Sequence, residues 1–192
     1  MAEPVQKRAR ETRARLIAAA DALVAERGFE ALRVEEVVLR AGVAKGTFFS
    51  HFRDKDALMD QLVGARINGI LDEIEAGEAP RDVDEMVAAL VSLMRFMTCE
   101  RYVFDLILRY SGAAAVEEIG PIARTFGRQM DIAVGWLHEG PFRRDVPADL
   151  LAEGVQAFLV QAMALHFCML HSDQAMRDRL AVYLRAWLMP AV

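Results

Sequence analysis

A glycine at position 42 separates two short segments with helical periodicity, and this junction constrains the fold more than any other feature of the chain. Before it, apolar residues recur every three or four positions, as on one face of a helix: Val34, Val37, Val38 and Ala41. Gly42 can adopt the left-handed backbone that ends a helix, and Val43 can fill the corner behind it. A second helix is expected to begin at about Ala44. The segment is therefore predicted to be a helix-turn-helix.

The second helix of this motif has one apolar and one small or polar face. Phe48 and Phe52 are four residues apart and can both pack inward. The residues that then lie on or beside the exposed face are Lys45, Thr47, Phe49, Ser50 and His51. Small, polar and cationic groups at the start of a short helix can approach base edges and phosphates in a major groove. Double-stranded DNA is therefore the first partner to consider.

Residues 10–58 resemble the N-terminal domain of the tetracycline-repressor (TetR) family of bacterial transcription regulators. The matching words, in order and without a gap, are Ile17-Ala18-Ala19-Ala20, Glu26-Arg27-Gly28-Phe29-Glu30-Ala31, Ala41-Gly42-Val43, Lys45-Gly46-Thr47, His51-Phe52 and Lys55-Asp56-Ala57-Leu58. The resemblance implies an all-α fold with a three-helix, helix-turn-helix DNA-binding domain at residues 1–55. It also implies that a helical effector-binding and dimerisation domain follows at residues 56–192.

The resemblance also implies roles for individual residues in DNA binding. Lys45 and Thr47 would approach bases, and Gly46 would allow the backbone to come close. Phosphates would be held by Arg33, Ser50, His51 and Lys55, while Phe49 would pack on sugar or methyl groups.

The chain departs from the family pattern at several of these positions. Arg33 stands where the family usually has a capping Thr, a loss typically of ~1 kcal/mol. Ala44 replaces a frequent Ser and Phe49 a usual Tyr, so two hydroxyls that could contact phosphate are missing. Glu35 is acidic where many relatives are neutral or basic. These changes affect the expected strength and register of DNA binding.

Charge is unevenly distributed along the chain. Residues 1–55 contain 11 Lys and Arg against 8 Asp and Glu, whereas residues 56–192 contain 12 against 20. A basic head on an acidic body would orient the molecule toward a polyanion. The densest basic run is Lys7-Arg8-Ala9-Arg10 with Arg13 and Arg15. This run is interpreted either as a solvated tail or as an arm that contacts phosphates or the minor groove.

The body is expected to be a set of amphipathic helices that form a dimer. Its last two helices, at 147–170 and 173–188, correspond to those that pair with their symmetry mates in the family. A homodimer would place two heads on a pseudo-palindromic operator, since one short motif contacts too few base pairs. On these helices the residues that can belong either to the dimer interface or to the core are Phe158, Leu165 and Leu180.

The body is also expected to hold an effector. Ten Met and ten Phe favour an apolar, deformable cavity for a small apolar or amphipathic molecule. The predicted lining residues, each of which can also be ordinary core, are Met94, Met97, Phe104, Leu108, Met130, Trp136, Phe158, Met163 and His166. Arg101, Asp105 and Arg109 form a ladder that is either a solvated face or, if buried, a site for an anionic headgroup.

Other classes of protein are disfavoured by motifs that the chain lacks. It has no Glu-x-x-His or His-Glu-x-x-His word, no nucleophile elbow and no phosphate-binding glycine loop. Its four His and two Cys have no metal-ligand spacing, so neither an enzyme nor a metal or cofactor is expected. No apolar run of about twenty residues and no secretory signal occur, and Cys99 and Cys168 are expected to be reduced.

The sequence therefore predicts a cytoplasmic, sequence-specific transcription regulator. The expected form is a repressor that an effector releases from its operator. The alternative is a DNA-binding architectural or partner-binding protein without an effector.

Overall fold

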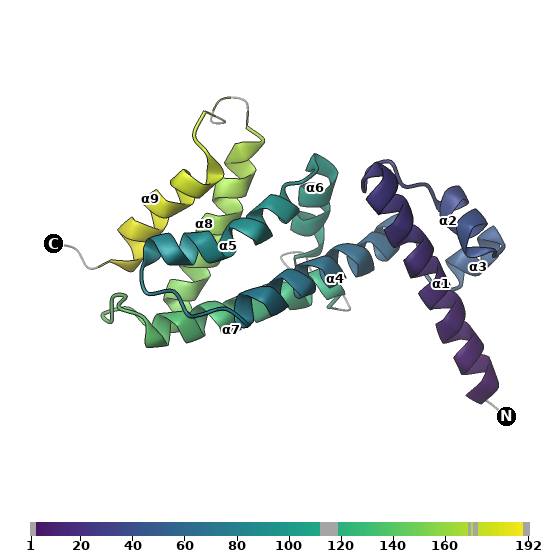
Figure 1. Ribbon diagram of the computed structural model, residues 1–192, viewed down its shortest axis with the longest axis horizontal. Coiled ribbons are helices and arrows are strands. Elements are labelled where there is room, and N and C mark those ends of the chain that lie inside the picture. The colour runs from purple at the N-terminus through teal and green to yellow at the C-terminus, as the bar shows by residue number, and fades with distance from the viewer. Residues whose placement is uncertain (1–2, 112–118, 169, 171–172, 190–192) are drawn as a thin grey trace.

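The computed structural model describes residues 3–111, 119–168, 170 and 173–189, and over these residues all regular structure is α-helical (Figure 1). The helices are α1 (Glu3–Arg27), α2 (Val34–Ala41), α3 (Lys45–Phe49), α4 (Lys55–Glu75), α5 (Val83–Met97), α6 (Arg101–Tyr110), α7 (Pro121–Glu139), α8 (Ala148–His166) and α9 (Met176–Leu188). The predicted all-α fold is confirmed.

The first three helices form a compact unit, here called the head, at one end of the molecule (Figure 1). Its core is built from side chains that are almost completely buried: Leu16, Ala20, Leu23, Leu32, Val37, Phe48 and Phe52. The remaining helices form the body, and α4 runs from the head into it (Figure 1). Movement of the body can therefore reach the head along α4.

Residue types predict several helix ends: Gly28 and Gly42 are expected to end helices, and Asp54 and Asp82 to begin them, and the structure confirms all four. Gly28 and Gly42 have φ values of 85° and 65° and follow the last residues of α1 and α2. The side chain of Asp54 accepts a hydrogen bond from the backbone N–H of Ala57, at 2.8 Å, and so caps α4. Asp82 caps α5 in the same way, with the N–H of Glu85 at 2.8 Å. Arg33 makes no capping hydrogen bond to α2, as the sequence led us to expect.

Several helix limits differ from the sequence predictions. Apolar periodicity predicts a first helix over about residues 10–27. Helix α1 begins instead at Glu3, because its first turns lack the apolar periodicity on which that prediction rests. Helix α3 ends at Phe49, and the Ser50 hydroxyl donates to the carbonyl of Thr47 at 2.7 Å, a local bond that competes with further helix. Helix α8 ends at His166, and α9 begins only at Met176.

Helices α4 and α7 share the most extensive contact in the body. A Cβ at Gly64 would lie 2.6 Å from the Pro121 side chain and 2.9 Å from its carbonyl carbon, so only glycine allows this approach. Next to it, the buried Asp60 accepts a hydrogen bond from the backbone N–H of Ile122, at 2.9 Å. Burial raises the pKa of this carboxyl group. The start of α7 is thus fixed to the middle of α4.

Helices α8 and α9 pack against each other at the far end of the body (Figure 1). A Cβ at Gly154 would clash with Nε1 of Trp187, and this Nε1 donates to the carbonyl of Leu151 at 3.0 Å. Helix α8 is the one described helix long and apolar enough to span a membrane, but a core helix passes the same test. It lies here between α7 and α9.

Candidate DNA-binding site and body cavity

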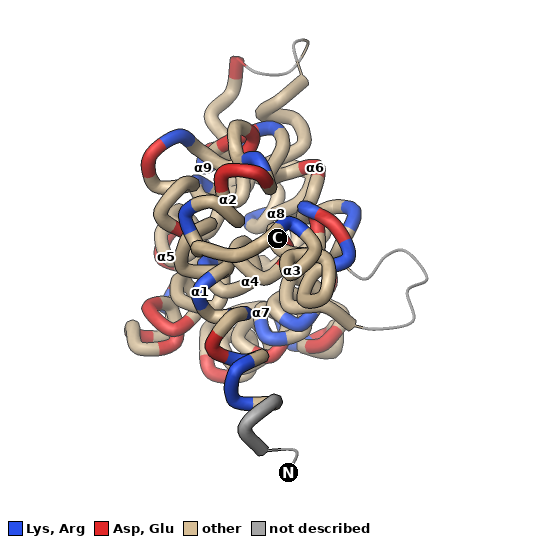
Figure 2. Tube along the Cα trace, turned by 90° about the vertical axis from the view of Figure 1, so that its right-hand side faces the viewer, with Lys and Arg blue, Asp and Glu red and all other residues tan. Residues whose placement is uncertain are grey.

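Helix α3 presents the face on which DNA contact was predicted. Phe48 lies beneath it, with its ring 5.3 Å from that of Phe49 and 5.5 Å from that of Phe52. Phe49 itself is 51% exposed, so the two inward positions and the outward one are as predicted. A Cβ at Gly46 would meet no atom within 4 Å, which leaves the backbone at the start of α3 open to close approach. Figure 2 looks onto this end of the molecule.

Lys45 is held by a carboxylate of the preceding helix. Its Nζ donates to Oε1 of Glu35 at 2.5 Å, and both side chains are well exposed. This hydrogen bond keeps the pKa of Glu35 below its ordinary value. A phosphate or base edge would therefore share Lys45 with Glu35 or compete with it.

The predicted phosphate contacts lie around α3. Arg33 is exposed, and its guanidinium donates to the carbonyl of Glu30 at 3.1 Å. Ala44 is the exposed N-cap of α3 and offers no side-chain cap. Ser50 is exposed beyond the last turn of α3, whereas Thr47 and His51 are half-buried.

Lys55 faces the junction between head and body. Its Nζ donates to the carbonyl of Glu30 at 3.1 Å and lies 4.7 Å from the centre of the Tyr102 ring. Burial lowers the pKa of Lys55, and the charge of Arg33 adds to this effect. The Tyr102 hydroxyl in turn donates to Asp56 at 3.0 Å. In this structure Lys55 thus ties the loop between α1 and α2 to α6.

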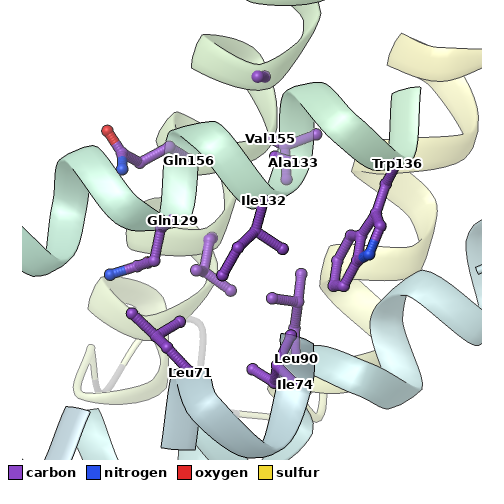
Figure 3. A pocket seen from close by; sticks show the side chains of 11 residues that line it. Leu71, Ile74, Leu90, Gln129, Ile132, Ala133, Trp136, Val155 and Gln156 are labelled. Carbon is purple, nitrogen blue, oxygen red and sulfur yellow. The ribbon is translucent and has the colours of Figure 1, made fainter. Parts of the chain in front are cut away.

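The body encloses a cavity of about 20 Å³ between α4, α5, α7 and α8 (Figure 3). Its wall is mostly aliphatic and aromatic, with two glutamines: Leu71, Ile74, Leu90, Gln129, Ile132, Ala133, Trp136, Ala152, Val155, Gln156 and Leu159. Gln156 donates to the carbonyl of Phe126 at 3.1 Å. The Nε2 of Gln129 is buried and has no hydrogen-bond partner among the described residues.

Trp136 is the one predicted lining residue that reaches this cavity. The predicted residues that are instead buried elsewhere in the core are Met94, Met97, Phe104 and Met163. Met130 and Phe158 are half-buried, Leu108 borders a separate open groove, and His166 is exposed with its ring 5.2 Å from that of Phe167. Periodicity identified buried faces but not the helix that each face meets. Gln129 and Gln156, which are polar residues on otherwise apolar helix faces, could have indicated the cavity but were overlooked in the sequence.

The charged ladder of α6 is divided between two partners. Arg101 pairs with Asp105 at 2.8 Å, and both side chains are exposed. Arg109 instead pairs with Asp56 of α4 at 2.5 Å. The solvated interpretation of this ladder therefore fits the structure. Among the described residues, no group of three or more His, Cys, Asp or Glu side chains is placed to hold a metal ion.

The comparisons with known proteins agree with the helix-turn-helix. Residues 16–62 match the model of the family described as bacterial regulatory proteins, tetR family. Two regulators of Bacillus subtilis (strain 168) are similar, both named uncharacterized HTH-type transcriptional regulators. YerO is 32% identical over 79 residues, which are 38% of this chain and 27% of YerO. YvdT is 29% identical over 101 residues, which are 52% of each chain. The chain thus spans about half or less of the length of these relatives.

Solved structures show the same fold over nearly the whole chain. RolR in complex with resorcinol has a TM-score of 0.68 at 23% identity, covering 96% of this chain and 91% of RolR. FadR of Thermus thermophilus, a TetR-family repressor in complex with lauroyl-CoA, has a TM-score of 0.65 at 18% identity, covering 91% and 92%. Identities this low establish the fold alone. With the family match over residues 16–62 and the two named regulators, this shared fold makes the chain similar to DNA-binding transcriptional regulators of the TetR family.

Proposed function

We propose that the protein is a homodimeric repressor that binds a pseudo-palindromic operator and is released from it by a small apolar or amphipathic molecule. Residues 1–55 would bind DNA, and residues 56–192 would carry the effector and dimer functions in the cytoplasm. The observation that carries the DNA-binding part is the open start of α3. There Lys45 and Phe49 are exposed and nothing stands in front of Gly46. An element of this size and exposure fits a major groove.

The proposed dimer face lies on α8 and α9. Leu150 and Val182 are 48% and 55% exposed although both lie on helices that otherwise supply the core. Phe158 is half-buried against Tyr183 and Trp187, with ring centroids 5.2 and 6.0 Å apart, and Leu180 is fully buried. Leu180 thus belongs to the core, and the apolar side chains left outside favour a second copy of the chain as their cover.

The cavity beside Trp136 is the proposed effector site. Its volume of about 20 Å³ holds little more than one water molecule, so a ligand can enter only if the helices around it move apart. Such movement is what release requires, because a ligand shifts the dimer only through a difference in affinity between two conformations. RolR and FadR are described in complex with resorcinol and lauroyl-CoA, and another related structure, from Saccharomonospora viridis, with choline. An aromatic or aliphatic group suits the wall of the present cavity.

The same small volume favours a second candidate function. A body without room for a ligand would serve a DNA-binding protein that senses no effector. A change in operator affinity on addition of a small molecule separates the two functions.

The first test is selection of bound sequences from random duplex DNA by the full-length protein at moderate salt. We expect a palindromic motif. Lys45→Ala should then weaken binding to that motif and leave the dimer intact. The control, Arg95→Ala at an exposed position on α5, should leave binding unchanged. Unchanged binding by Lys45→Ala would remove Lys45 from the site. Binding without a motif that is lost as salt rises would favour the architectural function.

A further inference from the structure

The segment where α5 ends and α6 begins, here called the α5–α6 corner, is hydrogen-bonded to the loop between α1 and α2. The carboxylate of Glu100 accepts hydrogen bonds from two consecutive backbone amides of this loop. Its Oε1 lies 2.7 Å from the N of Phe29, and its Oε2 lies 2.8 Å from the N of Glu30. Although Glu100 is the N-cap residue of α6, its side chain does not cap that helix. The side chain instead binds the head, at residues some seventy positions away in sequence.

The backbone of the loop is shaped to receive this carboxylate. Gly28 has a φ of 85°, and a Cβ at this position would lie only 2.6 Å from Oε1 of Glu100. The ring of Phe96, at the end of α5, meets the ring of Phe29 edge to face, with centroids 5.9 Å apart. The α5–α6 corner therefore contacts the loop through an apolar and a charged group together.

This contact lies between the DNA-binding motif on one side and the body cavity on the other. The loop continues directly into α2, which carries Glu35, the partner of Lys45 at the start of α3. On the other side, α5 carries Leu90, which lines the cavity, as well as Phe96. One helix of the body thus runs from the cavity wall to the loop that supports the DNA-binding motif.

We propose that Glu100 is a positioning residue for DNA binding, which holds the head in the orientation that the operator requires. When a ligand displaces α5, the head follows through Glu100. This last step rests on the proposed effector site, whereas the positioning role requires DNA binding alone.

Because Glu100 is negatively charged, a positioning role and a purely electrostatic role predict opposite changes in DNA affinity when the carboxylate is removed. Removing a carboxylate near the head reduces repulsion of phosphates, so on charge alone the affinity for DNA would rise. Loss of the two amide contacts frees the head to adopt other orientations, and DNA must then select the competent fraction, which lowers the affinity. The two effects have opposite signs.

The test compares Glu100→Ala and Glu100→Gln in the full-length protein, with Asp105→Asn as the matched control. Asp105 is an exposed carboxylate on the same helix, paired with Arg101 rather than with the head. Affinity for the selected duplex is measured at fixed salt, together with hydrogen exchange of the Phe29 and Glu30 amides. We expect Glu100→Ala to lose affinity by about fivefold or more, the lower end of measured couplings between sites. Asp105→Asn should retain or slightly raise it.

Glu100→Gln should be intermediate, because its amide oxygen can accept one N–H while its NH₂ group cannot accept the other. Both loop amides should exchange faster in Glu100→Ala and not in the control. Affinity that is unchanged or raised in Glu100→Ala, or loop amides that exchange as in the wild type, would overturn the positioning role. If the wild type shows no preferred sequence, the proposed function fails, and the same variants on a random duplex still decide the role of Glu100.

Discussion

The first turns of α1 should form a second contact with DNA, and the salt dependence of binding can reveal it. Among the side chains of α1 that the structure describes, from residue 6 on, the first fully buried one is Leu16, whereas the helix begins at Glu3. At a rise of 1.5 Å per residue these turns extend about 20 Å, which equals about six base pairs of duplex. In Figure 1 they project away from the body. Lys7, Arg8 and Arg10 are exposed there and make no ion pair among the described residues.

The size of the effect follows from counterion release. Each phosphate that a cation neutralises contributes about −0.9 to the slope of log K against log salt. Replacing Lys7, Arg8 and Arg10 together by Ala should therefore make this slope less negative by up to about 2.7. Lys7 lies nine residues before Leu16, about 14 Å along the helix, so the change should appear only on duplexes that extend about four base pairs or more beyond the operator.

The assay is fluorescence anisotropy over a salt series, on operator duplexes with and without flanking base pairs. The triple variant and the wild type should have equal slopes on the short duplex and different slopes on the long one. Circular dichroism should show how much of the helix the substitutions retain. Equal slopes on both duplexes would refute the reasoning and leave the basic run as a solvated tail.

Two further predictions concern single carboxylates. Because burial raises the pKa of Asp60 in the folded protein, its contribution to stability is present at low pH and is lost as pH rises through the raised pKa. Asp60→Asn keeps an acceptor for the N–H of Ile122 but has no carboxyl group to ionise. As pH rises through the raised pKa, the melting temperature of the variant should therefore rise relative to that of the wild type. Melting temperatures that change in parallel with pH in both proteins would contradict this. Glu35→Gln should release Lys45 and raise the affinity for any duplex several-fold, with Glu36→Gln, which loses a pair with Arg27, as the control. A loss of operator affinity would instead mean that Glu35 accepts a hydrogen bond from a base.

Features that depend on a few adjacent residues could be predicted from the sequence. The left-handed glycines at 28 and 42 and the caps at Asp54 and Asp82 act within one turn of the chain, so their residue types were sufficient. The inward packing of Phe48 and Phe52 followed from their spacing alone.

Features that depend on distant segments could not be predicted in this way. Met94 and Met163 are buried as their patterns implied, but which faces meet around the cavity is decided by the packing of four helices. Lys55 was assigned to phosphate from its place in the motif. Its contact with Tyr102 depends on the packing of α6 against α4, and its contact with Glu30 depends on the approach of the α1–α2 loop to the start of α4. Glu100 gave no signal in the sequence, since a single Glu at a helix start usually serves its own helix.

The construction of the cavity limits how a ligand can enlarge it. Helices α4 and α7 both line it, but they cannot separate without loss of the close approach at Gly64 and of the hydrogen bond from Ile122 to Asp60. Enlargement must then come from the walls that α5 and α8 provide. Displacement of α5 acts on Phe96 and Glu100 and hence on the head, while displacement of α8 acts on the proposed dimer face. Either movement would change the distance between the two heads of the proposed dimer, so we expect a ligand that fits beside Trp136 to change operator affinity.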